Sequence, residues 1–136
     1  MKFVLDTSAF SAAMRREIGL LVLLKELQPG NIVTVPPVVA EIQYGLERID
    51  HHSKKFQLLN SEKEKWLSVI NVLEWVPEAS IYFGRIKADL ERKGRMIDDF
   101  DIAIAAIAMA HDCGVITNNV KHFKRIDNLT VNFWTS

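Results

Sequence analysis

Three carboxylates in four residues stand at the head of the most apolar stretch of the chain. Asp98, Asp99 and Asp101 precede residues 102–110, which carry no polar side chain. If this stretch is a helix, it is apolar on every side and therefore buried. Asp98 can cap such a helix, and acids suit its first turn. Three crowded acids also repel one another, however, and a bound cation is the usual remedy. Taken alone, the pattern allows either capping or a metal site.

Two further acids can join this cluster if the chain folds as a parallel sheet. Asp6 directly follows a short apolar stretch, and Glu41 lies early in a helical pattern that begins at two prolines. Ligands of such sheets lie outside the carboxyl ends of the strands. Asp6 could merely cap the next helix, but a carboxylate at a buried strand end favours a ligand. Oxygen ligands without a cysteine partner suit Mg²⁺ or Mn²⁺ rather than zinc.

The elements that must position these acids alternate between strand and helix along a single domain of 136 residues. Apolar and β-branched stretches predict strands, and apolar residues at helical spacing predict helices. The strands are expected at residues 2–5, 32–35, 72–76, 115–117 and 129–133. The helices are expected from residue 9, at 20–27, at 36–49, after a polar loop at 51–65, at 78–93 with Ile81 facing inward, from 98, and before residue 125. This alternation predicts an α/β fold with a mostly parallel sheet.

The composition is that of an ordinary globular protein with a formal net charge of zero. Lysine plus arginine and aspartate plus glutamate both number 17, so a nucleic-acid partner needs a local basic patch. The lone Cys113 excludes an internal disulfide framework and favours a reducing compartment. No leader or membrane-length apolar stretch is seen, so we expect a cytoplasmic protein without a membrane partner. The candidate phosphate contacts are Arg15, Arg16, Lys54, Lys55, Lys121, Lys124 and Arg125.

Four stretches in order along the chain resemble a known family. They are Val4-Leu5-Asp6-Thr7-Ser8, Val39-Ala40-Glu41-Ile42-Gln43-Tyr44-Gly45-Leu46, Asp99-Phe100-Asp101-Ile102-Ala103-Ile104-Ala105-Ala106 and Ile116-Thr117-Asn118-Asn119-Val120-Lys121-His122-Phe123. This succession is similar to the PIN-domain ribonucleases, and most closely to the VapC-type toxins of toxin–antitoxin pairs. The resemblance covers essentially the whole chain and implies a three-layer α/β/α fold.

The resemblance also implies chemistry, residue by residue. It implies an Mg²⁺-dependent endoribonuclease, with Mn²⁺ as a substitute, that hydrolyses RNA phosphodiester bonds. The family's first three acids map to Asp6, Glu41 and Asp101, as catalytic residues and metal ligands, with Asp99 as an additional ligand. The family's fourth acidic position falls on Asn119, which leaves one or two metal ions open.

The partners that the resemblance implies are a second copy of the chain and a VapB-like antitoxin. A C-terminal segment of the antitoxin would enter a groove near the site. The leucine-rich helix at residues 20–27 is a candidate wall of that groove.

The polar residues beside the acids have two interpretations. Thr7, Ser8 and Thr117 are either turn formers or, together with Asn119, groups that orient the carboxylates. The histidines at 51, 52 and 122 are expected to be solvated.

Two other functions remain open. A PIN-like binding module without catalysis follows if the missing fourth acid prevents metal binding. A phospho-acceptor receiver domain also carries acids at the carboxyl edge of a parallel sheet. It requires an acidic pair after the first strand and an acceptor aspartate after a central one, which this sequence lacks.

Overall fold

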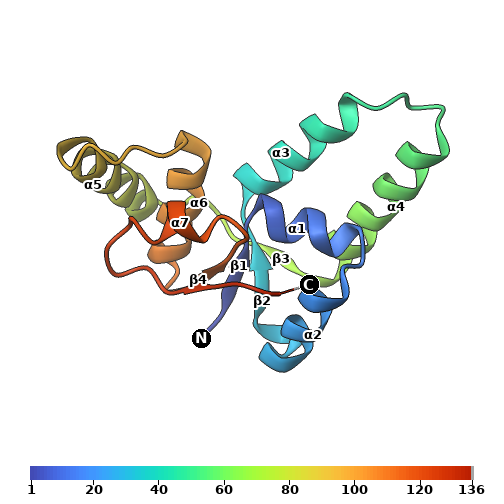
Figure 1. Cartoon of the computed structure of the whole chain (residues 1–136), viewed down its shortest axis with the longest axis horizontal. Coiled ribbons are helices and arrows are strands. Elements are labelled where there is room, and N and C mark those ends of the chain that lie inside the picture. Colours follow the sequence, from blue (N-terminus) through green and yellow to red (C-terminus); the bar gives the residue numbers. More distant parts are fainter. Residues whose placement is uncertain (136) are drawn as a thin grey trace.

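The computed structural model describes residues 1–135, which form a five-stranded, fully parallel sheet between two layers of helices (Figure 1). The strands run in the order β3-β2-β1-β4-β5. Their bounds are β1 Phe3–Leu5, β2 Ile32–Thr34, β3 Asn71–Val72, β4 Gly114–Ile116 and β5 Val131–Asn132. The predicted three-layer α/β/α architecture is therefore confirmed.

The helices divide between the two faces of the sheet according to their place in the chain. Those up to β3 lie on one side and those after it on the other (Figure 1). The first group is α1 Thr7–Met14, α2 Ile18–Leu27, the short 3-10 turn η1 Pro29–Asn31, α3 Pro36–Glu47 and α4 Lys54–Val69. The second group is α5 Pro77–Arg92, α6 Asp99–Ala110 and α7 Val120–Phe123.

The strand order reverses at β1, which pairs with β2 on one side and with β4 on the other. Phe3 lies opposite both Ile32 and Gly114, so the three central strands end at nearly the same level. Ligands of parallel sheets bind in the crevice outside such a reversal point. Asp6 and Thr117, the residues that follow β1 and β4, are thereby brought together.

The core is built on the central strands and on α6. Residues 102–108 of α6 are all buried, as an apolar stretch predicts for a helix between other elements. Small alanine side chains let α6 pack closely against its neighbours, including α5, α3 and β1. The acids at its first turn are thus fixed to one of the most buried elements of the fold.

Several predicted element bounds are wrong in the same direction, toward more helix and less strand. Helix α4 begins at Lys54, inside the stretch expected to be a loop, because the Ser53 hydroxyl caps it by accepting from the Phe56 amide at 3.1 Å. Strand β3 ends at Val72 rather than residue 76, after one further bond from Leu73 N to the Thr34 carbonyl. Ile81 is 54% exposed on the outer face of α5 and does not face inward.

The last strand is also shorter than the alternation at residues 129–133 predicts. Only Val131 and Asn132 pair with β4, through Val115 and Ile116. Among residues 1–135, no helix is both long and apolar enough to cross a membrane.

Candidate metal-dependent active site

Asp6 is the buried centre of the candidate site. It directly follows β1 and is 1% exposed. Its Oδ1 accepts from the Ala9 amide at 2.8 Å and from the Ser8 hydroxyl at 2.7 Å, and its Oδ2 accepts from the Thr117 hydroxyl at 2.6 Å. Asp6 therefore caps α1 and still lies among other polar groups. Burial raises its pKa, the three hydrogen bonds oppose that rise, and the charge of Glu41 adds to it.

Glu41 approaches Asp6 from the second turn of α3. Its Oε1 accepts a 2.5 Å hydrogen bond from the Thr7 hydroxyl, which stands directly after Asp6. This bond fixes the carboxylate of one helix to the start of another. Arg48, nearly two turns further along α3, lies with its guanidinium 5.6 Å from the centre of the Tyr44 ring.

Asp101 completes the cluster from the first turn of α6. Burial raises its pKa to about 6, with smaller contributions from the charges of Asp6, Asp98 and Glu41. His122 on α7 lowers it, because its Nδ1 lies 3.6 Å from Asp101 Oδ2. The three carboxylates that the sequence pointed to are therefore close enough to influence one another. They come from three different elements.

The connection between β4 and α7 holds Asp6 in place through hydroxyl groups. Thr117 Oγ1 donates to Asp6 and accepts from the Asn119 amide at 2.8 Å. Ser8 Oγ donates to Asp6 in the same way and accepts from the Asn118 amide at 2.9 Å. The interpretation of Thr117 and Ser8 as orienting groups thus has direct geometric support. The exposed Asn119 takes part through its backbone, a role that its side-chain type does not reveal.

The remaining acids of the α6 stretch take other partners. Asp98 caps α6, as predicted, by accepting from the Phe100 amide at 2.8 Å. Asp99 is 58% exposed and forms an ion pair with Lys87 of α5 at 3.1 Å. Its assignment as a further metal ligand stays a prediction.

Several candidate phosphate contacts are engaged within the protein. Arg15 forms an ion pair with Glu17 at 2.6 Å. Arg16 forms one with the buried Glu62 of α4. Arg125 donates to the Met96 carbonyl at 2.9 Å. His122, expected to be solvated, is half exposed but lies beside Asp101.

A groove opens beside Glu41 between α1, α3 and α4. Gly45 borders it one turn after Glu41, and a Cβ atom there would meet no other atom within 4 Å. The groove is lined by Thr7, Ser11, Met14, Arg15, Glu41, Ile42, Gly45, Leu46, Ile49, Lys55 and Leu59. No residue of Ile18–Leu27 is among them, so the leucine-rich helix does not line this groove, and its role as a wall of the antitoxin groove stays a prediction. Leu20 and Leu24 of that helix are buried in the core.

The donor set fits a small, hydrated divalent cation. Within residues 1–135, no three His, Cys, Asp or Glu side chains are gathered into a ready cage for a metal ion. Mg²⁺ does not need one, because it binds through one or two carboxylates and keeps several waters. Asp6, Glu41 and Asp101 repel one another, and a cation among them would relieve that repulsion. Zinc, which prefers cysteine and histidine ligands, fits less well.

Comparison with known proteins identifies the family of this chain. The PIN domain family profile matches residues 3–129, nearly the whole chain. The chain belongs to the PIN domain family. The resemblance drawn from the four stretches of sequence is thereby confirmed, and the receiver-domain alternative is excluded.

The relatives of this PIN domain are VapC ribonucleases. Ribonuclease VapC2 of Rickettsia felis is 34% identical over 112 residues, covering 82% of this chain and 81% of the relative. The tRNA(fMet)-specific endonuclease VapC of Shigella flexneri is 27% identical over 135 residues, or 99% of each chain. Among solved structures, VapBC2 of Rickettsia felis bound to a promoter DNA fragment superposes with a TM-score of 0.87 and 32% identity, covering 99% of this chain and 100% of that one. PIN-domain ribonucleases are metal-dependent.

Two features of this PIN domain escaped the sequence analysis. The contact between His122 and Asp101 joins α7 to α6, and the Arg125 contact with Met96 joins the same segments. A single signal was available: His122 and Arg125 stand three residues apart, directly after the Asn118-Asn119 turn.

Proposed function

We propose that this PIN domain is the endoribonuclease toxin of a type II toxin–antitoxin pair, and that Mg²⁺ is its metal, with Mn²⁺ as a substitute. The observation that carries the proposal is the meeting of Asp6, Glu41 and Asp101 at the reversal point of the sheet, where the charge of Glu41 raises the pKa of Asp6 and the charges of both raise the pKa of Asp101. Carboxylates held together against their own repulsion are suited to a cation.

Asp6, Glu41 and Asp101 would hold the ion, and each has a distinct task in this chain. Asp6 is kept in one orientation by Ser8, Thr117 and the Ala9 amide. Glu41 is directed toward the site by Thr7. Asp101, with a pKa of about 6, is mostly ionised at neutral pH and can bind a cation. When bound, a divalent ion supplies an activated water and neutralises charge on the phosphate.

RNA is the substrate that best fits the surroundings of these acids. The groove beside Glu41 carries Arg15 and Lys55 among its lining residues, and Lys121 and Lys124 lie on or next to α7. Cations at these positions can contact phosphates on either side of the acids. The naming of relatives as ribonucleases, one of them specific for a tRNA, supports the same substrate class.

A VapB-like antitoxin is the proposed inhibitor. The relatives of known structure include complexes of VapC with VapB. The groove between α1, α3 and α4 combines apolar residues such as Met14, Ile42 and Leu59 with Glu41 at one side. A peptide seated there would cover Glu41 and exclude RNA from the acids. Both partners meet in the cytoplasm, where the free Cys113 would stay reduced.

A homodimer is the proposed oligomeric state. An apolar groove between α3, α5 and α6 is lined by Pro36, Pro37, Ala40, Trp75, Phe83, Asp99, Phe100 and Ala103. Trp75 and Phe100 are 44% and 43% exposed there, although large aromatic side chains are usually more buried. Sedimentation of the parent protein and of Trp75→Ser tests this assignment. We expect the parent protein to be a dimer and the variant to be a monomer.

The decisive experiment is RNA cleavage by the purified protein, with and without a chelator, paired with thermal unfolding. Cleavage should require added Mg²⁺ or Mn²⁺. The temperature midpoint of unfolding should also rise when the ion is added. The expected gain in unfolding free energy is about 2.7 kcal/mol when the ion is at a hundredfold excess over its dissociation constant. A melting curve indifferent to millimolar divalent ion, together with no cleavage, would establish the PIN-like binding module instead.

A further inference from the structure

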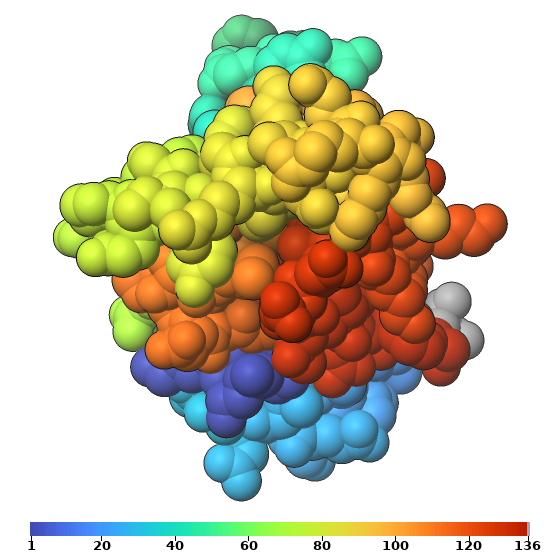
Figure 2. Space-filling view, turned by 90° about the vertical axis from the view of Figure 1, so that its left-hand side faces the viewer, coloured from blue at the N-terminus to red at the C-terminus, as the bar shows by residue number. Residues whose placement is uncertain are grey.

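Arg125 directs its guanidinium group at two backbone carbonyls. It lies just beyond α7, and its Nη1 donates to the Met96 carbonyl at 2.9 Å and to the Arg95 carbonyl at 3.5 Å. These carbonyls belong to the connection between α5 and α6. In Figure 2 the C-terminal part of the chain, in red, lies directly against this region, in yellow and gold.

The Arg125 side chain is partly buried, although it lies beyond the end of a short helix. Its Nε is buried and is the one enclosed side-chain nitrogen or oxygen in residues 1–135 that has no hydrogen-bond partner. Burying a donor without a partner is unfavourable. The position of Arg125 therefore includes an unfavourable contribution to the free energy of folding from its unpaired Nε. We look for the favourable contribution in the segments that the Met96 contact holds together.

The two segments that Arg125 joins both lead directly into the candidate site. Met96 stands two residues before Asp98, which caps α6 and so fixes the turn that carries Asp101. Arg125 itself follows α7, whose His122 lies 3.6 Å from Asp101. The same helix is preceded by Asn119, whose amide donates to the Thr117 hydroxyl that in turn donates to Asp6.

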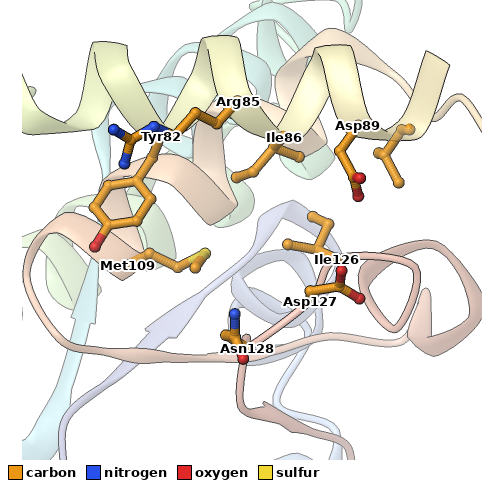
Figure 3. Close-up of a pocket in the computed structure, with 9 residues that line it drawn as sticks. Tyr82, Arg85, Ile86, Asp89, Met109, Ile126, Asp127 and Asn128 are labelled. Atoms are coloured by element: carbon orange, nitrogen blue, oxygen red, sulfur yellow. The ribbon is translucent and has the colours of Figure 1, made fainter. Parts of the chain in front are cut away.

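Close packing does not replace this contact. Directly beyond Arg125, a pocket opens between α5 and residues 126–128, with Tyr82, Ile86 and Met109 on its walls (Figure 3). A second connection, the ion pair between Lys93 and Asp127 at 3.0 Å, crosses the same boundary. Its side chains are 42% and 72% exposed, so solvent screens it. The Arg125 contact differs from it in that the arginine side chain carries a buried nitrogen, Nε, although the hydrogen bond to Met96 itself lies at the surface.

We propose that Arg125 is a positioning residue for Asp101: by holding the Arg95–Met96 backbone against α7, it sets the place of α6's first turn relative to Asp6. This inference rests on the proposed function for its effect on metal binding and cleavage. It also replaces the interpretation of Arg125 as a phosphate contact.

The test compares Arg125→Met, which keeps the apolar stem, with Arg125→Lys, which keeps one cationic donor, and with Asp127→Asn as the matched control. In Arg125→Met, we expect the calorimetric dissociation constant for Mn²⁺ to rise roughly tenfold or more, as for other residues that orient metal ligands. We expect kcat to fall with KM for RNA unchanged. Amide exchange at Phe100 and Ile102 should accelerate in the metal-free protein. Arg125→Lys should restore part of each effect, and Asp127→Asn should match the parent.

Three results would overturn the proposal. The first is that Arg125→Met has the same Mn²⁺ affinity and the same amide exchange as Asp127→Asn. If Arg125→Met does not fold, the same comparison is made with Arg125→Lys. The second is that the variant has a raised KM for RNA and that the salt dependence of its RNA binding falls by the amount of about one phosphate contact. This result would show that Arg125 contacts the substrate. The third is unchanged amide exchange at Phe100 and Ile102. That measurement needs neither metal nor RNA, so it separates failure of this inference from failure of the proposed function.

Discussion

The Thr117 hydroxyl donates a 2.6 Å hydrogen bond to Asp6 Oδ2, joining residues 111 positions apart in sequence. Both groups are buried, Thr117 at 0% and Asp6 at 1% exposure. The bond exists because β1 and β4 are neighbours in the sheet and end at the same level. It orients the most buried carboxylate of the site and opposes the rise in its pKa that burial causes.

Thr117→Val should therefore weaken the site as well as the fold. Valine has nearly the same shape but leaves Asp6 Oδ2 and the Asn119 amide without their partner. We expect a loss of about 1–3 kcal/mol in unfolding free energy and weaker Mn²⁺ binding by calorimetry. Thr34→Val is the matched control, since the buried Thr34 hydroxyl bonds only the Leu5 carbonyl at 3.0 Å. Equal effects of both variants on Mn²⁺ binding would contradict an orienting role for Thr117.

Asp101→Asn should abolish cleavage while leaving the fold intact or slightly more stable. The side chain is nearly the same size, and its neutral amide removes repulsion with Asp6 and Glu41. Cleavage of RNA and denaturant unfolding measure the two effects. Asp99→Asn is the control, because Asp99 pairs with Lys87 and should matter less. Parent-like cleavage by Asp101→Asn would refute the proposed mechanism.

The stability of the metal-free protein should fall as pH rises from about 4 to about 6. Asp101 has a pKa raised from 3.8 to about 6 in the folded state, so the folded protein binds more protons than the unfolded chain in this window. Its stabilising contribution is fully present below pH 4 and is lost through pH 6, by about 3 kcal/mol at most. Denaturant unfolding in a chelating buffer, with Asp101→Asn as reference, measures it. A parent-to-variant difference that does not vary with pH would rule this out.

Asn119→Asp should tighten metal binding modestly and add a second site at most weakly. Asn119 is exposed, and the bond that ties it to the site comes from its backbone amide. A carboxylate at this position would add negative charge near the acids without disturbing that bond. Asn119→Ala should reduce activity less than Asp101→Asn. Calorimetry with Mn²⁺ gives the stoichiometry, and two equally tight ions in the parent would be incompatible with this account.

Two acids of the site, Asp6 and Asp101, were predictable because each stands where an apolar stretch begins or ends, whereas Glu41 lies within α3 and was assigned through the family resemblance. Asp6 follows a buried strand and Asp101 opens a buried helix, and a parallel sheet brings such positions to one edge. Their charges and their order in the chain were enough to predict a metal site. The sequence also contained the Ser53 cap that starts α4, but the polar residues after it resemble those of a loop.

The contacts that hold the acids were not predictable, because they depend on the order of strands in space. Nothing in the residue types says that Asn118 donates its amide to Ser8, or that Arg125 turns toward Met96. These bonds join segments far apart in sequence and arise from backbone groups, which every residue possesses.

The pairing of β1 with β4 has a consequence for when this protein becomes active during its synthesis. Asp6 is synthesised 111 residues before its partner Thr117. Such long-range pairings form late and slowly in folding. A growing chain, or one truncated before β4, contains all three acids but lacks the Thr117 hydroxyl that holds Asp6 Oδ2. The site of this nuclease therefore stays incompletely ordered until translation has passed Thr117.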